Sequence, residues 1–314
     1  MKHYTANWIH SNLDFPTLIK ALRDGFRREY LVPDRMHINY DSGGEENTLL
    51  LMPAIATERV MGVKVVNVAP DNARLSLPSI QGIYYLANAR TGVPIATFDA
   101  RAITNWRTAA ASALASSYLS RSNASRLLMI GTGGLAPFLI DAHAAIRTIE
   151  SLTVYGRDYR KAEQLAASKK QSFSESLATE DLAVAVAEAD IISVATLSEN
   201  PLIHGDWLKP GQHIDLVGSF KPNMREADDQ VMKKSRIFMD SLSTASKESG
   251  DLAIPLKNGI IDESDLLGDL FGLCQGKVEG RQSEKEITLF KSVGHALEDL
   301  SAALYVMKGL REEG

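Results

Sequence analysis

Residues 127–158 constrain this chain more than any other segment, because they place a glycine-rich turn between a strand and a helix. The apolar run Leu127–Ile130 leads into the turn 131–136 (GTGGLA), and a helical pattern follows to about Arg147. A second apolar strand then covers Leu152 to Tyr155. This is the G-x-G-x-x-[G/A] pattern in the strand–turn–helix–strand setting that is typical of dinucleotide binding.

Each position of the turn has a predicted role toward such a cofactor. Gly131 permits the tight turn, and Gly133 lets a pyrophosphate approach the backbone, where N–H groups of the helix N-terminus can hold it. Gly134 and Leu135 complete the turn and are predicted to contact the cofactor. Ala136 lets the helix pack close to the strand.

The end of the second strand indicates which dinucleotide binds. NAD sites usually carry an acidic residue there for the ribose 2′-hydroxyl, whereas this strand is followed by Arg157. A guanidinium can stack on adenine and pair with a 2′-phosphate, so we predict NADPH, with NADH as the alternative. The alternative for Arg157 itself is a solvated loop residue. Asp158 follows one position late, either as the cap of the next helix or as a displaced ribose ligand.

Composition narrows the class of protein. A chain of 314 residues with 45% hydrophobic and 23% charged residues is typical of a globular enzyme with two domains. A net charge of −5 gives no reason to expect nucleic acid or an anionic membrane as a partner. The lone Cys274, the N-terminus without a signal-peptide pattern and the lack of a spanning apolar run predict a cytoplasmic protein. The seven scattered histidines predict no metal site.

Periodicity predicts the remaining elements. The first 30 residues have a helical face with Leu18, Leu22 and Phe26, and a helix capped by Thr104 or Asn105 is expected over Trp106–Leu119. A hairpin turns at Gly92, where a positive φ is expected. Strands are expected at 47–53, 62–68, 80–99 (the hairpin), 189–196, 213–218 and 236–240.

The order of these elements predicts an α/β fold: a Rossmann-type doubly wound parallel sheet plus a discontinuous β-rich domain. One long helix is expected over Ser283–Leu310, with Leu289 and Val293 on its apolar face. We therefore place the Rossmann dinucleotide-binding domain at residues 121–282, inserted between residues 1–120 and 283–314.

Candidate chemistry outside the glycine-rich turn is cationic. Lys64 lies inside an apolar strand, where it either serves an active site or extends from an edge strand into water. Arg107 near the expected helix N-terminus opposes the local dipole and needs an anionic partner, unless it is a solvated first-turn residue. Arg35, taken alone, is most simply a surface residue.

Other polar groups are assigned no chemistry. His204 and His213 are predicted to be structural. The acidic run that includes Glu226, Asp228 and Asp229 fits a helix N-terminal turn, where negative charge is favourable. Strand ends at Thr196 and Gly218 are expected at the carboxyl edge of the sheet, where ligands bind in such folds.

Six blocks, in this order and spacing, give the chain a resemblance to the ornithine cyclodeaminase/mu-crystallin family over about residues 15–310. They are residues 50–54 (LLMPA), 62–65 (GVKV), 107–115 (RTAAASALA), 131–136 (GTGGLA), 216–228 (LVGSFKPNMREAD) and 291–303 (KSVGHALEDLSAA). The resemblance implies a homodimer, in which residues 1–120 and 283–314 form the substrate-binding and dimerisation domain.

The resemblance also implies roles for single residues. Arg35, Lys64 and Arg107 match the family's substrate-carboxylate and catalytic positions, and Thr108 is expected to contact the cofactor. The residues that match cofactor positions are Gly131, Gly133, Arg157, Thr196 and Gly218.

One departure from the family pattern narrows the activity. Ornithine cyclodeaminases carry an aspartate in a Gly-Gly-Asp-x-Pro stretch, whereas here Phe220 occupies that position. A phenyl ring can neither accept a proton nor pair with an ammonium. The segment resembles the Δ1-pyrroline-2-carboxylate reductase branch, which implies NAD(P)H-dependent reduction of that cyclic ketimine to L-proline, or of Δ1-piperideine-2-carboxylate to L-pipecolate, with Phe220 against the ring. The alternatives are an alanine dehydrogenase, an ornithine cyclodeaminase or a non-catalytic NADPH-dependent binding protein.

Overall fold

The computed structural model describes residues 1–56 and 59–309. Two compact units make up the chain: unit 1 comprises residues 1–108 and 294–314, and unit 2 comprises residues 109–293. The boundary between them falls inside helix α3 (Ala100–Leu119). Within residues 1–56 and 59–309 we find no helix with the length and apolarity needed to cross a membrane.

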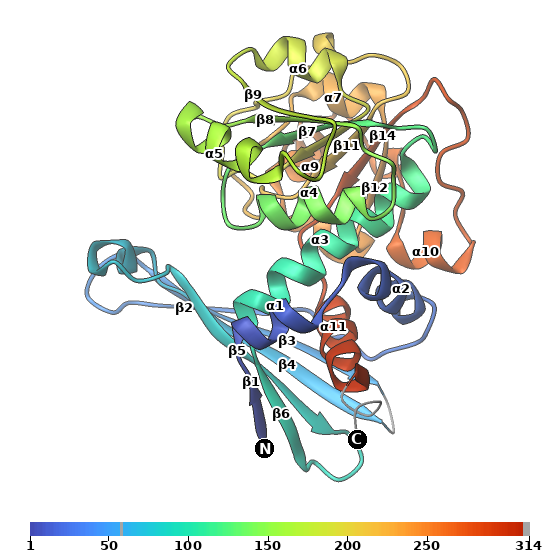
Figure 1. Cartoon of the computed structure of the whole chain (residues 1–314). Helices are drawn as coiled ribbons and strands as arrows, with labels where there is room; N and C mark the ends of the chain where they lie inside the picture. The colour runs from blue at the N-terminus through green and yellow to red at the C-terminus, as the bar shows by residue number, and fades with distance from the viewer. Residues whose placement is uncertain (57–58, 310–314) are drawn as a thin grey trace. The chain divides into compact units, whose positions relative to one another are not determined.

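Unit 1 is built on a six-stranded sheet in the order β1-β6-β5-β4-β3-β2, in which β1 pairs parallel with β6 and the other neighbours are antiparallel. Helices α2 and α11 pack against each other, and α11 contacts β3 and β4 (Figure 1). Its elements are β1 (Lys2–Tyr4), α1 (Ala6–Asn12), α2 (Phe15–Phe26), β2 (Met36–Tyr40), β3 (Asn47–Ala56), β4 (Val60–Val68), the 3₁₀ turn η1 (Pro70–Leu75), β5 (Ile80–Asn88), β6 (Pro94–Asp99), the first part of α3, and α11 (Ala296–Gly309).

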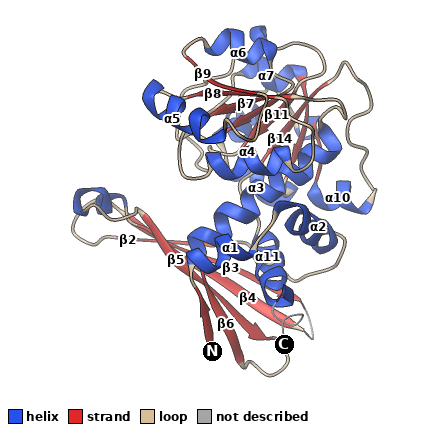
Figure 2. Ribbon diagram, viewed as in Figure 1, coloured by secondary structure: helices blue, strands red, loops and turns tan. Residues whose placement is uncertain are grey.

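Unit 2 contains an eight-stranded, wholly parallel sheet in the order β13-β12-β14-β11-β10-β7-β8-β9. Helices lie on both of its faces (Figure 2). Its elements are β7 (Arg126–Ile130), α4 (Ala136–Ala144), β8 (Ser151–Tyr155), α5 (Tyr159–Lys169), β9 (Glu175–Thr179), α6 (Leu182–Glu188), β10 (Ile191–Val194), η2 (Gly205–Trp207), β11 (His213–Leu216), α7 (Asp229–Lys234), β12 (Ser235–Met239), α8 (Leu242–Glu248), α9 (Gly250–Lys257), η3 (Glu263–Asp265), β13 (Leu266–Asp269), α10 (Leu270–Gln275) and β14 (Ile287–Lys291).

Strand order in unit 2 confirms the predicted doubly wound sheet. From β7 the chain adds β8 and β9 on one side, and it returns to add β10 and β11 on the other. The strand order therefore reverses between β7 and β10, which is the point where such sheets bind ligands at their carboxyl edge.

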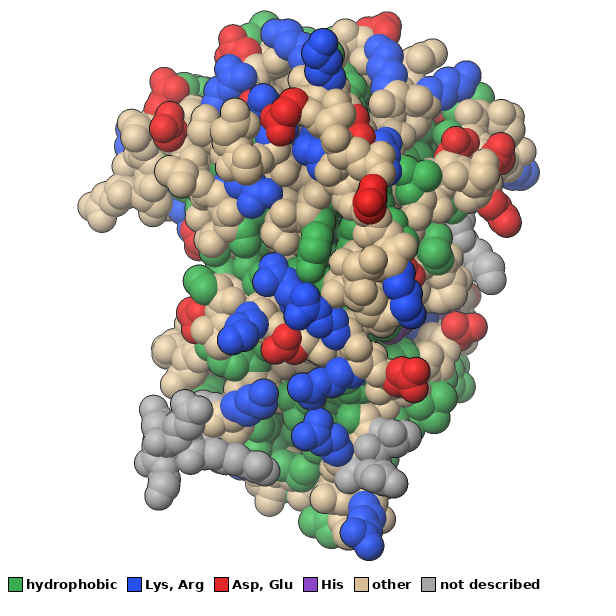
Figure 3. Space-filling view, turned by 90° about the vertical axis from the view of Figure 1, so that its right-hand side faces the viewer, with side chains coloured by type: hydrophobic (Ala, Val, Ile, Leu, Met, Phe, Trp, Pro, Cys, Tyr) green, Lys and Arg blue, Asp and Glu red, His purple; other side chains and the backbone are tan. Residues whose placement is uncertain are grey.

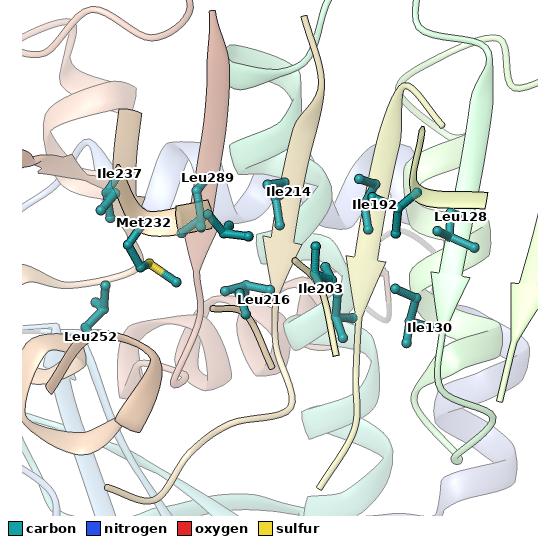
Figure 4. Packing of buried hydrophobic residues seen from close by; sticks show 14 of the residues in the cluster. Leu128, Ile130, Ile192, Ile203, Ile214, Leu216, Met232, Ile237, Leu252 and Leu289 are labelled. Carbon is teal, nitrogen blue, oxygen red and sulfur yellow. The ribbon is translucent and has the colours of Figure 1, made fainter. Parts of the chain in front are cut away.

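Branched apolar side chains fill one face of this sheet because both faces of a parallel sheet are covered. Figure 4 shows these side chains on neighbouring strands: Ile130 on β7, Ile192 on β10, Leu216 on β11 and Leu289 on β14. All four are essentially inaccessible to water. Acidic and basic side chains, by contrast, are interspersed on the visible outer surface of unit 2 (Figure 3).

Several sequence-based expectations are confirmed. The face of α2 buries Leu18, Leu22 and Phe26 completely. The hairpin forms from β5 and β6, and Gly92 in its turn has φ +71°. Strand β1 and the strands β9 and β13 were not predicted.

The predicted helix over Ser283–Leu310 is wrong. Residues Ile287–Lys291 form strand β14, which inserts between β11 and β12, and only Ala296–Gly309 are helical as α11. An apolar run buried on both faces has no alternation that would mark it as a strand, so periodicity alone failed here. As a result, residues 283–293 lie with the parallel sheet in unit 2 rather than with unit 1.

The predicted start of the alanine-rich helix is also wrong. Helix α3 begins at Ala100, and the Asp99 carboxylate accepts a hydrogen bond from the Ala102 N–H at 2.7 Å. Arg107 therefore lies two turns inside the helix, away from the N-terminal dipole.

The assignment of substrate binding to one unit and dinucleotide binding to the other stays a prediction.

Candidate active site

Lys64 belongs to a buried row of side chains that crosses the sheet of unit 1. Strand pairing places Met52, Lys64, Tyr84 and Phe98 opposite one another on β3, β4, β5 and β6. All four are buried, and Lys64 is only 4% exposed. Because β4 lies inside the sheet, the alternative of an edge-strand lysine with its ammonium in water is wrong.

The ammonium of Lys64 is compensated by a carboxylate from the other end of the chain. Its Nζ lies 3.1 Å from Oδ1 and 2.9 Å from Oδ2 of Asp299 on α11, and 3.4 Å from Oγ1 of Thr104. Burial and the Arg107 charge lower the pKa of Lys64 to about 8, while Asp299 opposes that shift. A lysine near this pKa can both hold a proton and release it close to neutral pH.

Arg107 joins the same cluster from α3. Its Nε donates to Asp299 Oδ1 at 3.0 Å, and its Nη1 donates to Glu298 Oε2 at 2.6 Å. The guanidinium is 5% exposed. The predicted need of Arg107 for an anionic partner is thus met inside unit 1 by two carboxylates of α11, so the alternative of a solvated first-turn residue is wrong.

Arg35 reaches this cluster through the segment that precedes α11. Its Nη2 donates to the Gly294 carbonyl at 2.8 Å, and Gly294 itself packs against the Arg107 guanidinium. Arg35 also contributes to the electrostatic field that lowers the Lys64 pKa. The structure therefore brings together the three cations that the sequence pointed to from separate segments.

This group brings charged side chains of both signs together. Lys64, Arg107 and Arg35 supply cationic groups, and Glu298 and Asp299 supply carboxylates. The group is largely buried, and electrostatic interactions there are stronger than in water. An arrangement of this kind suits a small anion such as a carboxylate.

Asp299 and Glu298 were missed by the sequence analysis. The signal was present, since Asp299 shares a helix face with Ala302, Ala303 and Val306, and all three are buried. A carboxylate on an otherwise apolar helix face requires a buried cation as its partner. Because one long helix was expected from residue 283, its apolar face was assigned to other residues and the two carboxylates were not recognised.

The glycine-rich turn in unit 2 lies directly after β7, as predicted. Gly131 has φ +114°, and a Cβ there would collide with the Ala195 carbonyl oxygen. Among the described residues, and apart from the chain neighbours of Gly133, no atom lies within 4 Å of the place that a Cβ on Gly133 would take, so the backbone is open to close approach. Leu135, the N-cap of α4, offers no side-chain hydrogen bond to the helix N-terminus. These features fit a site for a dinucleotide pyrophosphate.

The loops after β10 and β11 meet beside this turn. Thr196 lies within 4 Å of a Cβ built on Gly131, and a Cβ on Gly218 would overlap the backbone of Thr196. Three of the predicted cofactor residues therefore lie at one edge of the parallel sheet. Glu226 connects them: its carboxylate accepts hydrogen bonds from the backbone N–H groups of both Thr196 and Gly218.

The expectation for the acidic run is confirmed for two of its residues and wrong for Glu226. Asp228 caps α7 through a hydrogen bond from the Val231 N–H, and Asp229 lies in the first turn of that helix. Glu226 is instead fully buried at the sheet edge. Lys291 at the end of β14 is equally buried and was not singled out either. Its position after the largely apolar segment 287–290 (ITLF) was a usable signal, because an unpaired ammonium is not buried in a strand.

Arg157 and Asp158 follow β8, as the sequence suggested. Asp158 is the N-cap of α5, and its side chain accepts hydrogen bonds from the Arg160 and Lys161 N–H groups. Of the two roles considered for Asp158, the structure supports the helix cap. Arg157 is exposed beside it.

The remaining predicted residues are placed as follows. Thr108 is buried in α3, and Phe220 is 41% exposed, with the Lys221 ammonium 5.9 Å from its ring centroid. His213 is buried and contacts Thr288 Oγ1, and burial lowers its pKa to about 3. His204 pairs with Asp228. Among the described residues, no cluster of three or more His, Cys, Asp or Glu side chains suits a metal ion.

Comparison with known proteins identifies the family. The model of the ornithine cyclodeaminase/mu-crystallin family matches residues 3–314. The chain belongs to this family. A member from Colwellia psychrerythraea, Δ1-pyrroline-2-carboxylate reductase, is 38% identical over 320 residues, which cover 99% of this chain and 100% of that protein.

Solved structures of family members have the same fold. The Δ1-pyrroline-2-carboxylate reductase of Thermococcus litoralis, in complex with NADH and L-proline, superimposes with a TM-score of 0.93 at 32% identity, over 100% of this chain and 98% of that one. An archaeal alanine dehydrogenase dimer with bound NAD has a TM-score of 0.92 at 27% identity, over 100% and 97% of the two chains. The predicted resemblance and fold class are confirmed.

Proposed function

We propose that this chain is an NAD(P)H-dependent ketimine reductase that reduces Δ1-pyrroline-2-carboxylate to L-proline. Δ1-piperideine-2-carboxylate, with a six-membered ring, is a second substrate of the same class. The observation that carries the proposal is the buried group in unit 1 in which Lys64 and Arg107 share the carboxylates of α11 and Arg35 lies beside them. A non-catalytic binding protein would have no need for a buried lysine whose pKa is lowered to about 8.

The cations of this group bind the substrate carboxylate. Arg107 and Arg35 offer guanidinium forks that match a carboxylate, and Asp299 fixes the Nε edge of Arg107 at 3.0 Å. Holding the carboxylate in one orientation fixes the adjacent C=N bond. Much of the rate enhancement comes from this positioning.

Lys64 supplies a proton near the imine nitrogen. The carbon of an imine that is protonated on nitrogen is a better hydride acceptor, and an acid with a pKa near the working pH is effective in such proton transfer. Its lowered pKa of about 8 meets that condition, and Asp299 holds the Nζ in place. When bound, the reduced nicotinamide supplies the hydride.

The dinucleotide is proposed to bind at the carboxyl edge of the parallel sheet, with Gly131, Gly133, Gly134, Leu135 and Ala136 around its pyrophosphate. Thr196 and Gly218 line the same edge, and Thr108 is proposed as a further contact. The open backbone at Gly133 and the N-terminus of α4 support this assignment.

NADPH is the proposed physiological cofactor. The exposed Arg157 after β8 can pair with a 2′-phosphate. Asp158 is committed to capping α5, which leaves it a poor ribose ligand. NADH remains the alternative, since the Thermococcus litoralis reductase was solved with NADH.

Phe220 sets this proposal apart from ornithine cyclodeamination. A phenyl ring at the position of the family's aspartate cannot pair with the side-chain ammonium of ornithine. The proposed place of Phe220 is against the apolar part of the imine ring.

Steady-state turnover tests the proposal. NADPH oxidation is followed by absorbance with Δ1-pyrroline-2-carboxylate and, in a separate assay, with pyruvate plus ammonia. A third assay measures ammonia release from L-ornithine in the presence of NAD⁺. Oxidation of NADPH with the cyclic imine, and no turnover in the other two assays, supports the proposal. Turnover of pyruvate with ammonia would indicate an alanine dehydrogenase instead. Release of ammonia from ornithine would show that Phe220 does not exclude cyclodeamination.

We further propose that the protein is a homodimer, joined through the outer face of the unit 1 sheet. Strand pairing places Leu51, Val65 and Ile83 in one row of that face, opposite the face that buries Lys64. An uncovered sheet face normally carries polar residues, yet Ile83 is 45% and Ile38 42% exposed. A second copy of the chain would cover this apolar face, as such faces mark interfaces.

A further inference from the structure

One buried carboxylate connects the loops that follow β10 and β11. Glu226 is completely buried. Its Oε1 accepts hydrogen bonds from the Thr196 N–H at 2.7 Å and the Thr196 hydroxyl at 2.9 Å. Its Oε2 accepts from the N–H groups of Gly218 at 2.8 Å and Ser219 at 3.1 Å. Both oxygens therefore act as double acceptors, which is the bonding pattern of an ionised carboxylate.

Close packing between the loops also limits how far the glycine-rich turn can move relative to them. A side chain at Gly218 would overlap the backbone of Thr196, and one at Gly131 would overlap the Ala195 carbonyl. The three loops thus have little room to shift independently. A displacement of Thr196 would be passed on to the turn proposed to hold the pyrophosphate.

The charged groups that face Glu226 are Lys291 of β14 and Asp251 of α9, while the loops after β10 and β11 present N–H groups and a hydroxyl to it. Lys291 Nζ lies 3.3 Å from Asp251 Oδ2 and 3.9 Å from Glu226 Oε2. Asp251 Oδ1 accepts hydrogen bonds from the Glu226 and Ala227 N–H groups. None of these three side chains is accessible to water. One ammonium thus serves two carboxylates.

We infer that Glu226 is a positioning residue for the proposed dinucleotide site, holding the Thr196 and Gly218 loops in the binding arrangement only while it is ionised. This inference rests on the proposed function and goes beyond it by making cofactor affinity depend on pH. The ionised carboxylate of Glu226 accepts hydrogen bonds from N–H and hydroxyl groups of both loops. When protonated, it would point its own O–H at one of these donors, so at least one of the two loops would have to move.

The pH range of this effect follows from the surroundings of the carboxylate. Burial raises the pKa of Glu226, Lys291 lowers it and Asp251 raises it further, with a result of about 7. Ionisation then changes from about 10% at pH 6 to about 90% at pH 8. If only the ionised form binds well, cofactor affinity at pH 6 should be about tenfold weaker than at pH 8.

The experiment is a fluorescence titration of the purified protein with NADPH across this pH range, for the wild type and three variants. In Glu226→Gln the amide presents a donor to one of the loops, so we expect weak binding that does not change with pH. In Asp251→Asn the neighbouring negative charge is lost while Oδ1 remains, so the midpoint of the wild-type profile should move to lower pH. The control Glu199→Gln removes an exposed carboxylate from the loop after β10 and should leave the midpoint unchanged.

Each outcome decides the inference. A wild-type Kd that is constant between about pH 6 and pH 8, or a Glu226→Gln variant with wild-type affinity and profile, would overturn it. If Glu226→Gln fails to fold, the shift of the midpoint in Asp251→Asn still decides. A wild type that binds no dinucleotide at any pH would instead refute the proposed function, and the inference with it.

Discussion

Replacement of Asp299 by Asn tests the proposed chemistry most directly, because Asp299 contacts both cations that carry it. Its oxygens lie 2.9 Å and 3.1 Å from Lys64 Nζ. An opposite charge at this range typically raises the pKa of a cation by about 1–3 units. In Asp299→Asn we therefore expect the pKa of Lys64 to fall from about 8 to about 5–7.

The magnitude in the assay follows from the protonated fraction of Lys64. With a pKa of about 8, Lys64 is about 90% protonated at pH 7, and with a pKa of about 6 it is about 10% protonated. Imine reduction by Asp299→Asn at pH 7 should thus be about tenfold slower, and the alkaline limb of the rate profile should move to lower pH by about 1–3 units. At pH values below this limb, and with NADPH at saturating concentration, most of the activity should return.

The control is Glu298→Gln, since Glu298 is the neighbouring carboxylate that contacts Arg107 but has no hydrogen bond to Lys64. It should alter substrate KM and leave the alkaline limb in place. An unmoved limb in Asp299→Asn, or a loss of rate that is equal at all pH values, would refute the assigned role of Asp299. A melting temperature for each variant separates these effects from loss of the fold.

Four further predictions concern single positions. Lys64→Ala should abolish imine reduction while NADPH still binds in a fluorescence titration, and retained turnover would contradict the role of the lysine. Arg157→Ala should raise KM for NADPH about tenfold or more and leave KM for NADH nearly unchanged, as expected for the loss of a charged phosphate contact; an equal effect on both cofactors would contradict it. Gly218→Ala should lower the free energy of unfolding by about 1–3 kcal/mol through overpacking against Thr196, as measured by urea denaturation. Val65→Glu should convert the dimer to a monomer in light scattering, and an unchanged mass would place the interface elsewhere.

Local sequence patterns were sufficient for most of unit 2. The turn at Gly131, the strand before it and the helix after it follow from glycine spacing and apolar runs, which are short-range signals. Strand β14 escaped because residues 287–291 are buried on both faces and lack alternation. Without that strand, the second half of the parallel sheet could not be ordered, and the chain boundary of unit 2 was drawn too early.

The residues of the candidate site were likewise predictable only where the signal is local. Lys64 and Arg107 stood out because each places a charge in an apolar setting. Their partners Glu298 and Asp299 are about 190 or more residues away in sequence. No local pattern reports which distant carboxylate will compensate a buried cation, although the need for one could be stated in advance.

The Lys64 group of unit 1 and the Glu226 group of unit 2 both hold charged side chains in buried surroundings, but they suit ligands of opposite charge. In unit 1 Lys64 and Arg107 share the Asp299 carboxylate with Arg35 beside them, and this group of cations is proposed to bind a substrate carboxylate. In unit 2 one ammonium serves Glu226 and Asp251, so the group has an affinity for one more positive charge, and a proton is the smallest that fits. Since burial makes an uncompensated charge costly, the group in unit 2 should take up this proton as the pH falls through about 7. Reduction would then be lost on the acidic side through weaker cofactor binding and on the alkaline side through deprotonation of Lys64, and the Asp251→Asn and Asp299→Asn variants should move these two limbs independently.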